Sequence, residues 1–195
     1  MSHKVRLIFA LYSMLFLGNA FAGPFGLDMG MSLKGLDEPE KLGHGKYKIA
    51  NPPKPHSAFE AYIVQVAPES GLCWIKAIGK NIRTSSYGFE LQSAFNEMKG
   101  RLSGVYGEHE TTDLLFPGSI WDEPDDWMMG LVKKERMLGA AWGAAKGSKL
   151  PPDIESVFLA AMPASGDAGY IIVEYSFANE PSCEAELAAQ EDDAL

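Results

Sequence analysis

Residues 72–78 form a short stretch that is apolar on both of its faces, and this feature restricts the folds open to the chain. The alternation of a β-strand would place Leu72, Trp74 and Ile78 on one side and Cys73, Ile75 and Ala77 on the other. A strand of this kind lies inside a sheet and is covered on both sides. The sequence therefore predicts a layered protein with a sheet at its centre.

Two pairs of strand-like stretches are each joined by turn-forming residues. The first pair is residues 61–66 and 72–78, and the second is residues 154–162 and 170–177. Proline and glycine lie between the members of each pair, as is typical of hairpins. Hairpins that are contiguous in the sequence favour an antiparallel sheet over alternating parallel units.

Between the two hairpins, apolar residues recur at helical spacing. Residues 88–107 carry apolar side chains three and four positions apart, and Gly107 is placed to end the helix. Asp122 can cap a second helix, and Ser32 can cap a short one near the start. The apolar face of the second helix is predicted to contain Trp127, Leu131, Leu138 and Trp142.

Together these elements predict an α+β fold, an antiparallel sheet of two hairpins with two to three helices packed on one face. We expect a single domain over residues 23–180. Residues 181–195 are an acidic C-terminal segment, which is interpreted as a short helix or a solvated tail. A split into two domains near residues 107–117 is the alternative.

The first 22 residues have the pattern of a secretory signal peptide. Lys4 and Arg6 precede an apolar run over residues 7–17, and the small-x-small triplet at residues 20–22 suits cleavage before Gly23. The apolar run is shorter than the roughly 20 residues of a membrane-spanning helix. We therefore expect a periplasmic or secreted protein without a stable membrane anchor.

The two cysteines, Cys73 and Cys183, both follow the predicted cleavage site. An exported protein meets an oxidising environment, so a disulfide between them is expected. The bridge would tie a central strand to the segment that leaves the last strand. Two separate buried thiols are the alternative.

Charge is distributed unevenly along an acidic chain. The formal net charge is −9, and it becomes −11 without the two basic residues of the leader. Residues 34–83 carry eight Lys or Arg against five acids, whereas residues 84–195 carry seven against twenty. Repulsion from phosphates therefore disfavours nucleic acid as a partner.

The motifs of common catalytic and cofactor sites are absent from the sequence. His44, His56 and His109 have no partner at metal-ligand spacing, and no H-E-x-x-H, G-x-S-x-G, P-loop or dinucleotide motif occurs. The acids at positions 122, 123, 125 and 126 are explained by a helix start, although a weak calcium site there is an alternative. We therefore expect no metal, no cofactor and no catalytic residue.

Three aromatic residues, Phe116, Trp121 and Trp127, lie within twelve positions around a predicted turn. Aromatic side chains on loops often anchor partners, so these three are candidate partner contacts. The alternative is that Trp121 and Trp127 fasten the second helix to the core.

Residues 25–32, with the sequence FGLDMGMS, resemble the F-G-L-x-x-G-M-[ST] opening of various bacterial periplasmic proteins. The opening and the order of elements are also similar to small envelope domains of the β-lactamase-inhibitor-like and outer-membrane assembly lipoprotein type. That resemblance implies helices packed on an antiparallel sheet and a role in binding proteins without catalysis. The chain lacks the lipidated cysteine of those lipoproteins.

These observations favour a non-enzymatic exported interaction or binding domain of the bacterial envelope, with another envelope protein as a candidate partner. Two other functions stay open. One is an exported hydrolase that uses a pair of carboxylates. The other is a small-ligand carrier with a pocket between the sheet and the long helix.

Overall fold

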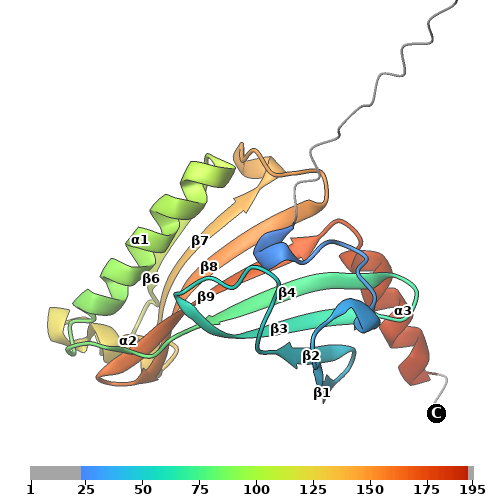
Figure 1. The fold of residues 1–195 in the computed structure, drawn as a ribbon. Coiled ribbons are helices and arrows are strands. Elements are labelled where there is room, and N and C mark those ends of the chain that lie inside the picture. The colour runs from blue at the N-terminus through green and yellow to red at the C-terminus, as the bar shows by residue number, and fades with distance from the viewer. Residues whose placement is uncertain (1–22, 193–195) are drawn as a thin grey trace, which may run out of the picture.

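A computed structural model describes residues 23–192, so the predicted leader lies outside the described residues. The described chain forms one open antiparallel sheet with three α-helices, which confirms the α+β class (Figure 1). The strands follow the spatial order β1-β2-β3-β4-β9-β8-β7-β6, and β5 pairs with one end of β9. Their bounds are β1 Glu40–Gly43, β2 Lys46–Ile49, β3 Phe59–Ala67, β4 Gly71–Gly79, β5 Ile82–Arg83, β6 Glu110–Leu115, β7 Arg136–Gly143, β8 Ile154–Ser165 and β9 Ala168–Phe177.

Both predicted hairpins are present, as β3–β4 and β8–β9, and they lie at the centre of the sheet because β4 pairs with β9. The sheet is nevertheless larger than two hairpins. The short strands β1 and β2 extend it on one side, and β7 and β6 extend it on the other. Strand β6 pairs with β7 from Glu110 to Leu115 although most of its side chains are exposed. A strand with so few buried residues has no clear apolar alternation to reveal it.

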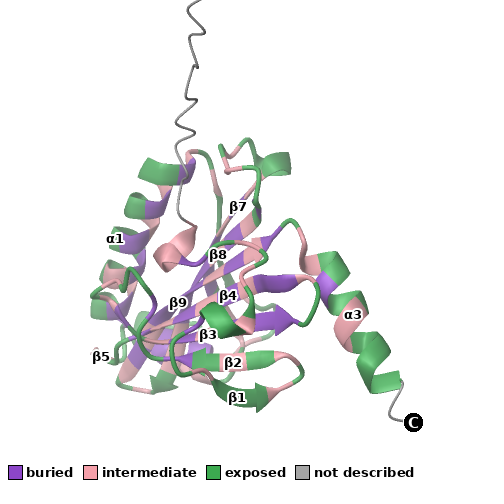
Figure 2. Cartoon of the chain, turned by 45° about the vertical axis from the view of Figure 1, so that its right-hand side comes forward, coloured by how far each residue is buried: buried purple, intermediate pink, exposed green. Residues whose placement is uncertain are grey.

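The long helix is confirmed as α1, Phe89–Tyr106, and Gly107 follows it with a positive φ of 78°. The buried residues of α1 and the N-terminal segment cover one face of the sheet, which we call the inner face. Leu91, Phe95 and Met98 of α1 belong to this core. Phe25 packs edge-on against Tyr62 and Tyr175, which lie on β3 and β9. Figure 2 shows the buried residues concentrated on the central strands.

The predicted second helix is wrong beyond its first turns. Helix α2 spans Trp127–Val132 only, and residues 136–143 form strand β7. Lys134 adopts a positive φ of 61° that turns the chain. Leu138 and Trp142 are buried as alternate members of a strand, together with Ala140, and the ladders to β6 and β8 satisfy the backbone. Spacings of four and seven residues had suggested a single helical face.

The segment at the C-terminus forms helix α3, Glu180–Asp192, so the short helix and not the solvated tail is observed for these residues. Helix α3 contacts β3 and β4. Gln65 donates a hydrogen bond of 2.9 Å from Nε2 to Oε1 of Glu184. Because Val64, the neighbour of Gln65, belongs to the inner core, α3 lies on the opposite, outer face. Residues of α1 and α2 both belong to the inner core, and α3 is a further helix that packs on the outer face.

A register shift in β4 explains how α3 is attached. Gln65 pairs with Trp74 and Val66 pairs with Leu72, which leaves Cys73 as an extra residue. Leu72 belongs to the inner core, whereas Cys73 packs with Cys183 in a separate outer cluster. The predicted disulfide between Cys73 and Cys183 is present, with the two Cα atoms 6.3 Å apart.

Candidate binding groove on the open face of the sheet

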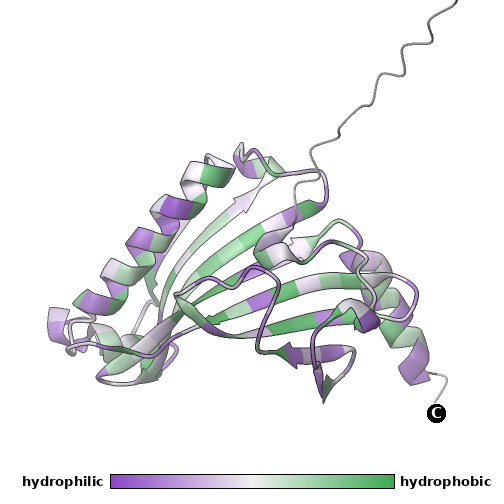
Figure 3. Cartoon of the chain, in the orientation of Figure 1, coloured by the Kyte–Doolittle hydropathy of each residue, from purple (hydrophilic) through white to green (hydrophobic). Residues whose placement is uncertain are grey.

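The outer face of the sheet is apolar well beyond the part that α3 contacts. Across the strands β4, β9 and β8, Lys76 lies opposite Glu174, and Glu174 lies opposite Phe158. In the next row Ile172 lies opposite Ala160, which in turn lies opposite Gly139 of β7. Figure 3 shows that hydrophobic residues predominate along β8 and β9. Apolar residues thus occupy both faces of these strands.

Strands β7 and β8 separate from each other and create a groove. Their pairing runs from Gly143 and Ser156 only as far as Gly139 and Ala160. Beyond that point, β7 continues to pair with β6 and β8 continues to pair with β9. A cavity of about 710 Å³ opens at this separation. Its apolar lining includes Phe116, Val132, Met137, Phe158, Met162 and Ile172.

Charged groups stand along the groove, and most of them are paired. Lys76 Nζ lies 2.9 Å from Glu174 Oε1. Arg136 donates from Nη1 to Oδ1 of Asp113 at 2.7 Å, and its guanidinium lies over the Trp127 ring. Lys134 also lines the groove, is exposed, and forms no ion pair within residues 23–192. The groove therefore combines an apolar lining with a net positive rim.

The three candidate aromatic residues have different surroundings. Phe116 is 43% exposed and lines the groove. Trp127 is only 7% exposed and belongs to the inner core. This position agrees with the alternative interpretation, in which Trp127 fastens the helix to the core. Trp121 is half-buried and does not line the groove. Only Phe116 is thus placed to contact a molecule in the groove, and that contact stays a prediction.

Met137, Phe158 and Lys134 are groove residues that the sequence interpretation missed. One signal was available for Phe158, because residues 154–162 are apolar at both odd and even positions. Met137 and Lys134 lie within the stretch from Trp127 to Trp142 that the spacing predicts as one helix, so no such signal exists for them. Their place at the groove depends on the turn at Lys134 and on the separation of β7 from β8.

The three histidines among residues 23–192 lie in different parts of the structure. His44 pairs with Glu191 of α3. Nδ1 of His56 accepts a hydrogen bond of 3.1 Å from the backbone N–H of Ala58. His109 lies 3.1 Å from the Ser103 hydroxyl. Within residues 23–192, no three side chains of His, Cys, Asp or Glu converge in a way that could hold a metal ion.

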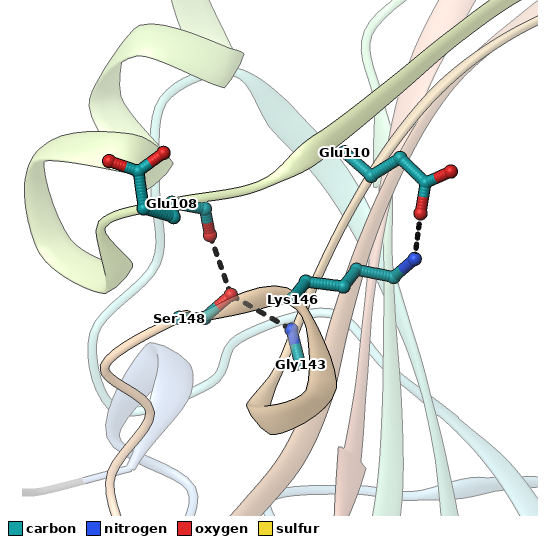
Figure 4. A network of polar contacts seen from close by, with 5 residues as sticks. All are labelled: Glu108, Glu110, Gly143, Lys146 and Ser148. Carbon is teal, nitrogen blue, oxygen red and sulfur yellow. Dashed lines mark hydrogen bonds and ion pairs between the residues drawn. The ribbon is translucent and has the colours of Figure 1, made fainter.

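Within residues 23–192, the carboxyl groups with a shifted pKa are stabilised in the charged form. Hydrogen bonding by Lys146 lowers the pKa of Glu110, and the Thr84 hydroxyl lowers that of Glu90. The Glu110–Lys146 pair belongs to a network at the end of α1, where the Ser148 hydroxyl donates to the Glu108 carbonyl (Figure 4). A general acid in a glycosidase needs a raised pKa, so these groups do not favour the hydrolase.

A smaller cavity of about 260 Å³ lies between α1 and the sheet, in the position expected for a small-ligand carrier. It is lined by Ala94 and Met98 of α1, by Ile82 and Ile171, and by the polar residues His56, Lys80 and Arg101. Pockets for drug-sized ligands usually measure about 300–1,000 Å³. The groove between β7 and β8 falls inside this range, whereas the cavity beneath α1 falls just below it.

No family model matches the chain, and neither the curated proteins nor the solved structures contain a match. The resemblance of residues 25–32 to periplasmic proteins therefore stays a prediction. No helix in the described part of the chain is both long enough and apolar enough to cross a membrane.

Proposed function

We propose that this chain is an exported, non-enzymatic binding domain of the bacterial envelope, and that it binds its partner through the groove between β7 and β8. The observation that carries the proposal is the apolar, uncovered outer face at this groove. Phe116 and Met137 line the groove and are 43% and 39% exposed, and Leu114, the cross-strand partner of Met137, is 43% exposed. Large exposed apolar patches on soluble proteins commonly mark interaction sites.

Burial of this surface supplies a driving force for binding. Each square ångström of apolar surface removed from water contributes about 25 cal/mol. The site is also preformed, because the groove lies between strands that are held by β6 on one side and β9 on the other. A preformed site avoids much of the entropic cost of ordering on binding.

The disulfide supports the exported location in the proposal. Structural disulfides persist in oxidising compartments and are rare in the cytosol. The Cys73–Cys183 bridge joins α3 to the central strand β4.

Methionine oxidation offers a direct test, because Met137 is a groove residue with an exposed side chain. The purified protein is treated with peroxide with and without an envelope extract, and oxidation is measured on each methionine peptide. We expect the extract to slow the oxidation of Met137 and to leave Met31, in the N-terminal segment, unchanged. Equal oxidation of Met137 in both conditions would contradict the proposal.

Two matched variants localise the effect. Phe116→Ser removes an apolar wall of the groove, whereas Val105→Ser removes an apolar side chain that is 68% exposed on α1. Protection of Met137 should be lost in the first variant and kept in the second. Equal protection in both variants would count against the groove as the binding site.

A further inference from the structure

Basic residues in the acidic half of the chain gather beside the groove. Residues 84–195 contain seven Lys or Arg against twenty acids. Three of the seven, Lys133, Lys134 and Arg136, lie in the turn between α2 and β7 and at the start of β7. Lys134 and Arg136 line the groove. A positive rim on a strongly acidic protein attracts anions locally.

Among residues 23–192, Lys134 is the groove-lining cation that forms no ion pair. Lys76 is neutralised by Glu174 and Arg136 by Asp113, but Lys134 forms no ion pair in the described part of the chain. The backbone also holds Lys134 in place. Its N–H donates to the Leu131 carbonyl at 3.0 Å, and the next N–H, that of Glu135, donates to the Gly130 carbonyl at 2.9 Å.

We propose that the groove binds a fatty acid, with the alkyl chain along the apolar lining and the carboxylate at Lys134. The inference rests on the proposed function and names the ligand class of the same site. A cavity of about 710 Å³ with an apolar lining suits an alkyl chain, and Lys134, which forms no ion pair within residues 23–192, suits a single anionic head group. An alkyl ammonium ion is disfavoured because Lys134 repels it.

Three probes that share one alkyl chain and differ in their head groups test whether the groove prefers a negatively charged head group. Dodecanoate, dodecanol and dodecylamine are titrated below their aggregation concentrations at physiological salt, and affinity is measured by calorimetry. Dodecanoate is expected to bind about fivefold more tightly than dodecanol, since an exposed ion pair contributes up to about that factor. Dodecylamine should bind more weakly than dodecanol. Equal affinity for the three would overturn the assignment of the head group.

A neighbouring pair of lysines provides matched variants. Lys134→Gln and Lys133→Gln make the same change at exposed positions, but only Lys134 lines the groove. Lys134→Gln should weaken dodecanoate binding about fivefold and leave dodecanol binding unchanged. Lys133→Gln should leave both affinities unchanged. An equal loss in both variants would indicate a diffuse field effect and overturn the proposed contact.

The alkyl chain is tested with Phe116→Ser and Met137→Ser, which alter exposed walls of the groove. Both should weaken dodecanoate and dodecanol alike, while Val105→Ser on α1 should weaken neither. Thermal unfolding of each variant checks that the fold is kept. If no probe binds while the envelope extract still protects Met137, the fatty-acid inference fails and the proposed binding function stands. If the extract does not protect Met137 either, both fail.

Discussion

Cys73 meets Cys183 because β4 shifts its register at Cys73 and turns this side chain to the outer face. In a regular strand Cys73 would share a face with Ile75, which lies in the inner core. The shift thus converts a core position into an attachment point for α3. The bridge closes a loop with a sequence separation of 110 residues, so it restricts much of the unfolded chain.

Replacement of both cysteines by serine should destabilise the protein by about 2–5 kcal/mol, since the unfolded chain regains the freedom that the bridge removes. Urea unfolding of the two proteins measures the difference. Thiol titration of the denatured, unreduced wild type is the control and should find no free thiol. An unchanged midpoint, or two free thiols in the wild type, would contradict this prediction.

Glu186 should make the docking of α3 sensitive to acid. Hydrogen bonds from the backbone N–H groups of Ser70, at 3.0 Å, and Glu69, at 2.8 Å, lower the pKa of Glu186 below its ordinary value of 4.5. The charged form is therefore favoured in the folded state. The charged Glu186 therefore adds to the stability of the folded protein above the ordinary pKa. This added stability is lost as the pH falls through the lower pKa of the folded state.

The substitution Glu186→Gln tests this contribution through urea midpoints at neutral and acid pH. The variant should be less stable than the wild type at neutral pH. This gap, the difference between the two urea midpoints, should close once the pH lies below the pKa of Glu186 in the folded state. Glu155→Gln, at an exposed position on β8, serves as the control and should show no such gap. A gap of the same size at both pH values would refute the assignment.

Two glycines near α1 should respond to alanine in opposite directions. Gly88 has a φ of 72°, and a Cβ there would overlap the Trp127 ring, so Gly88→Ala should cost about 1–3 kcal/mol. Gly100 lies inside α1 with open space around its Cβ position, so Gly100→Ala should stabilise by about 0.5–1 kcal/mol. Differential scanning calorimetry would reveal the two signs. A stabilised Gly88→Ala variant would be inconsistent with the packing of Trp127.

Tyr175 should resist ionisation until the protein unfolds in alkali. Burial raises its pKa well above the ordinary value of 10.0, and the nearby Tyr106 adds to the effect. Because the pKa of Tyr175 is raised in the folded state, its neutral form adds to the stability of the folded protein below the ordinary pKa. This contribution declines as the pH rises toward the pKa of the folded state. A spectrophotometric titration should therefore show buried tyrosines that ionise only together with unfolding. Tyr175→Phe should remove part of this alkaline sensitivity.

The central hairpins and α1 were predictable from the sequence because their apolar residues follow one clear period. Leu91, Phe95, Met98 and Leu102 repeat at helical spacing and are buried, whereas Val105, at the end of the same pattern, is exposed. Strand β7 was not predictable, since Leu138 and Trp142 fit a helical face as well as a strand. The ladders to β6 and β8 decide the outcome, and β6 itself has little apolar pattern.

The candidate groove was less accessible to sequence reasoning than the fold. Phe116 was identified as an exposed aromatic residue on a loop, and it does line the groove. Its neighbours Met162 and Lys134 are 28 positions apart in the sequence and meet only through the separation of β7 from β8. Trp127 shows the converse difficulty, because an aromatic residue beside a loop can equally belong to the core.

The early end of the β7–β8 ladder has a kinetic consequence. The ladder between β7 and β8 ends at Gly139 and Ala160. A molecule that enters between the two strands beyond that point therefore breaks no hydrogen bond of this ladder. Entry should therefore be a single step whose observed rate rises in proportion to ligand concentration, without a plateau set by slow opening of the protein.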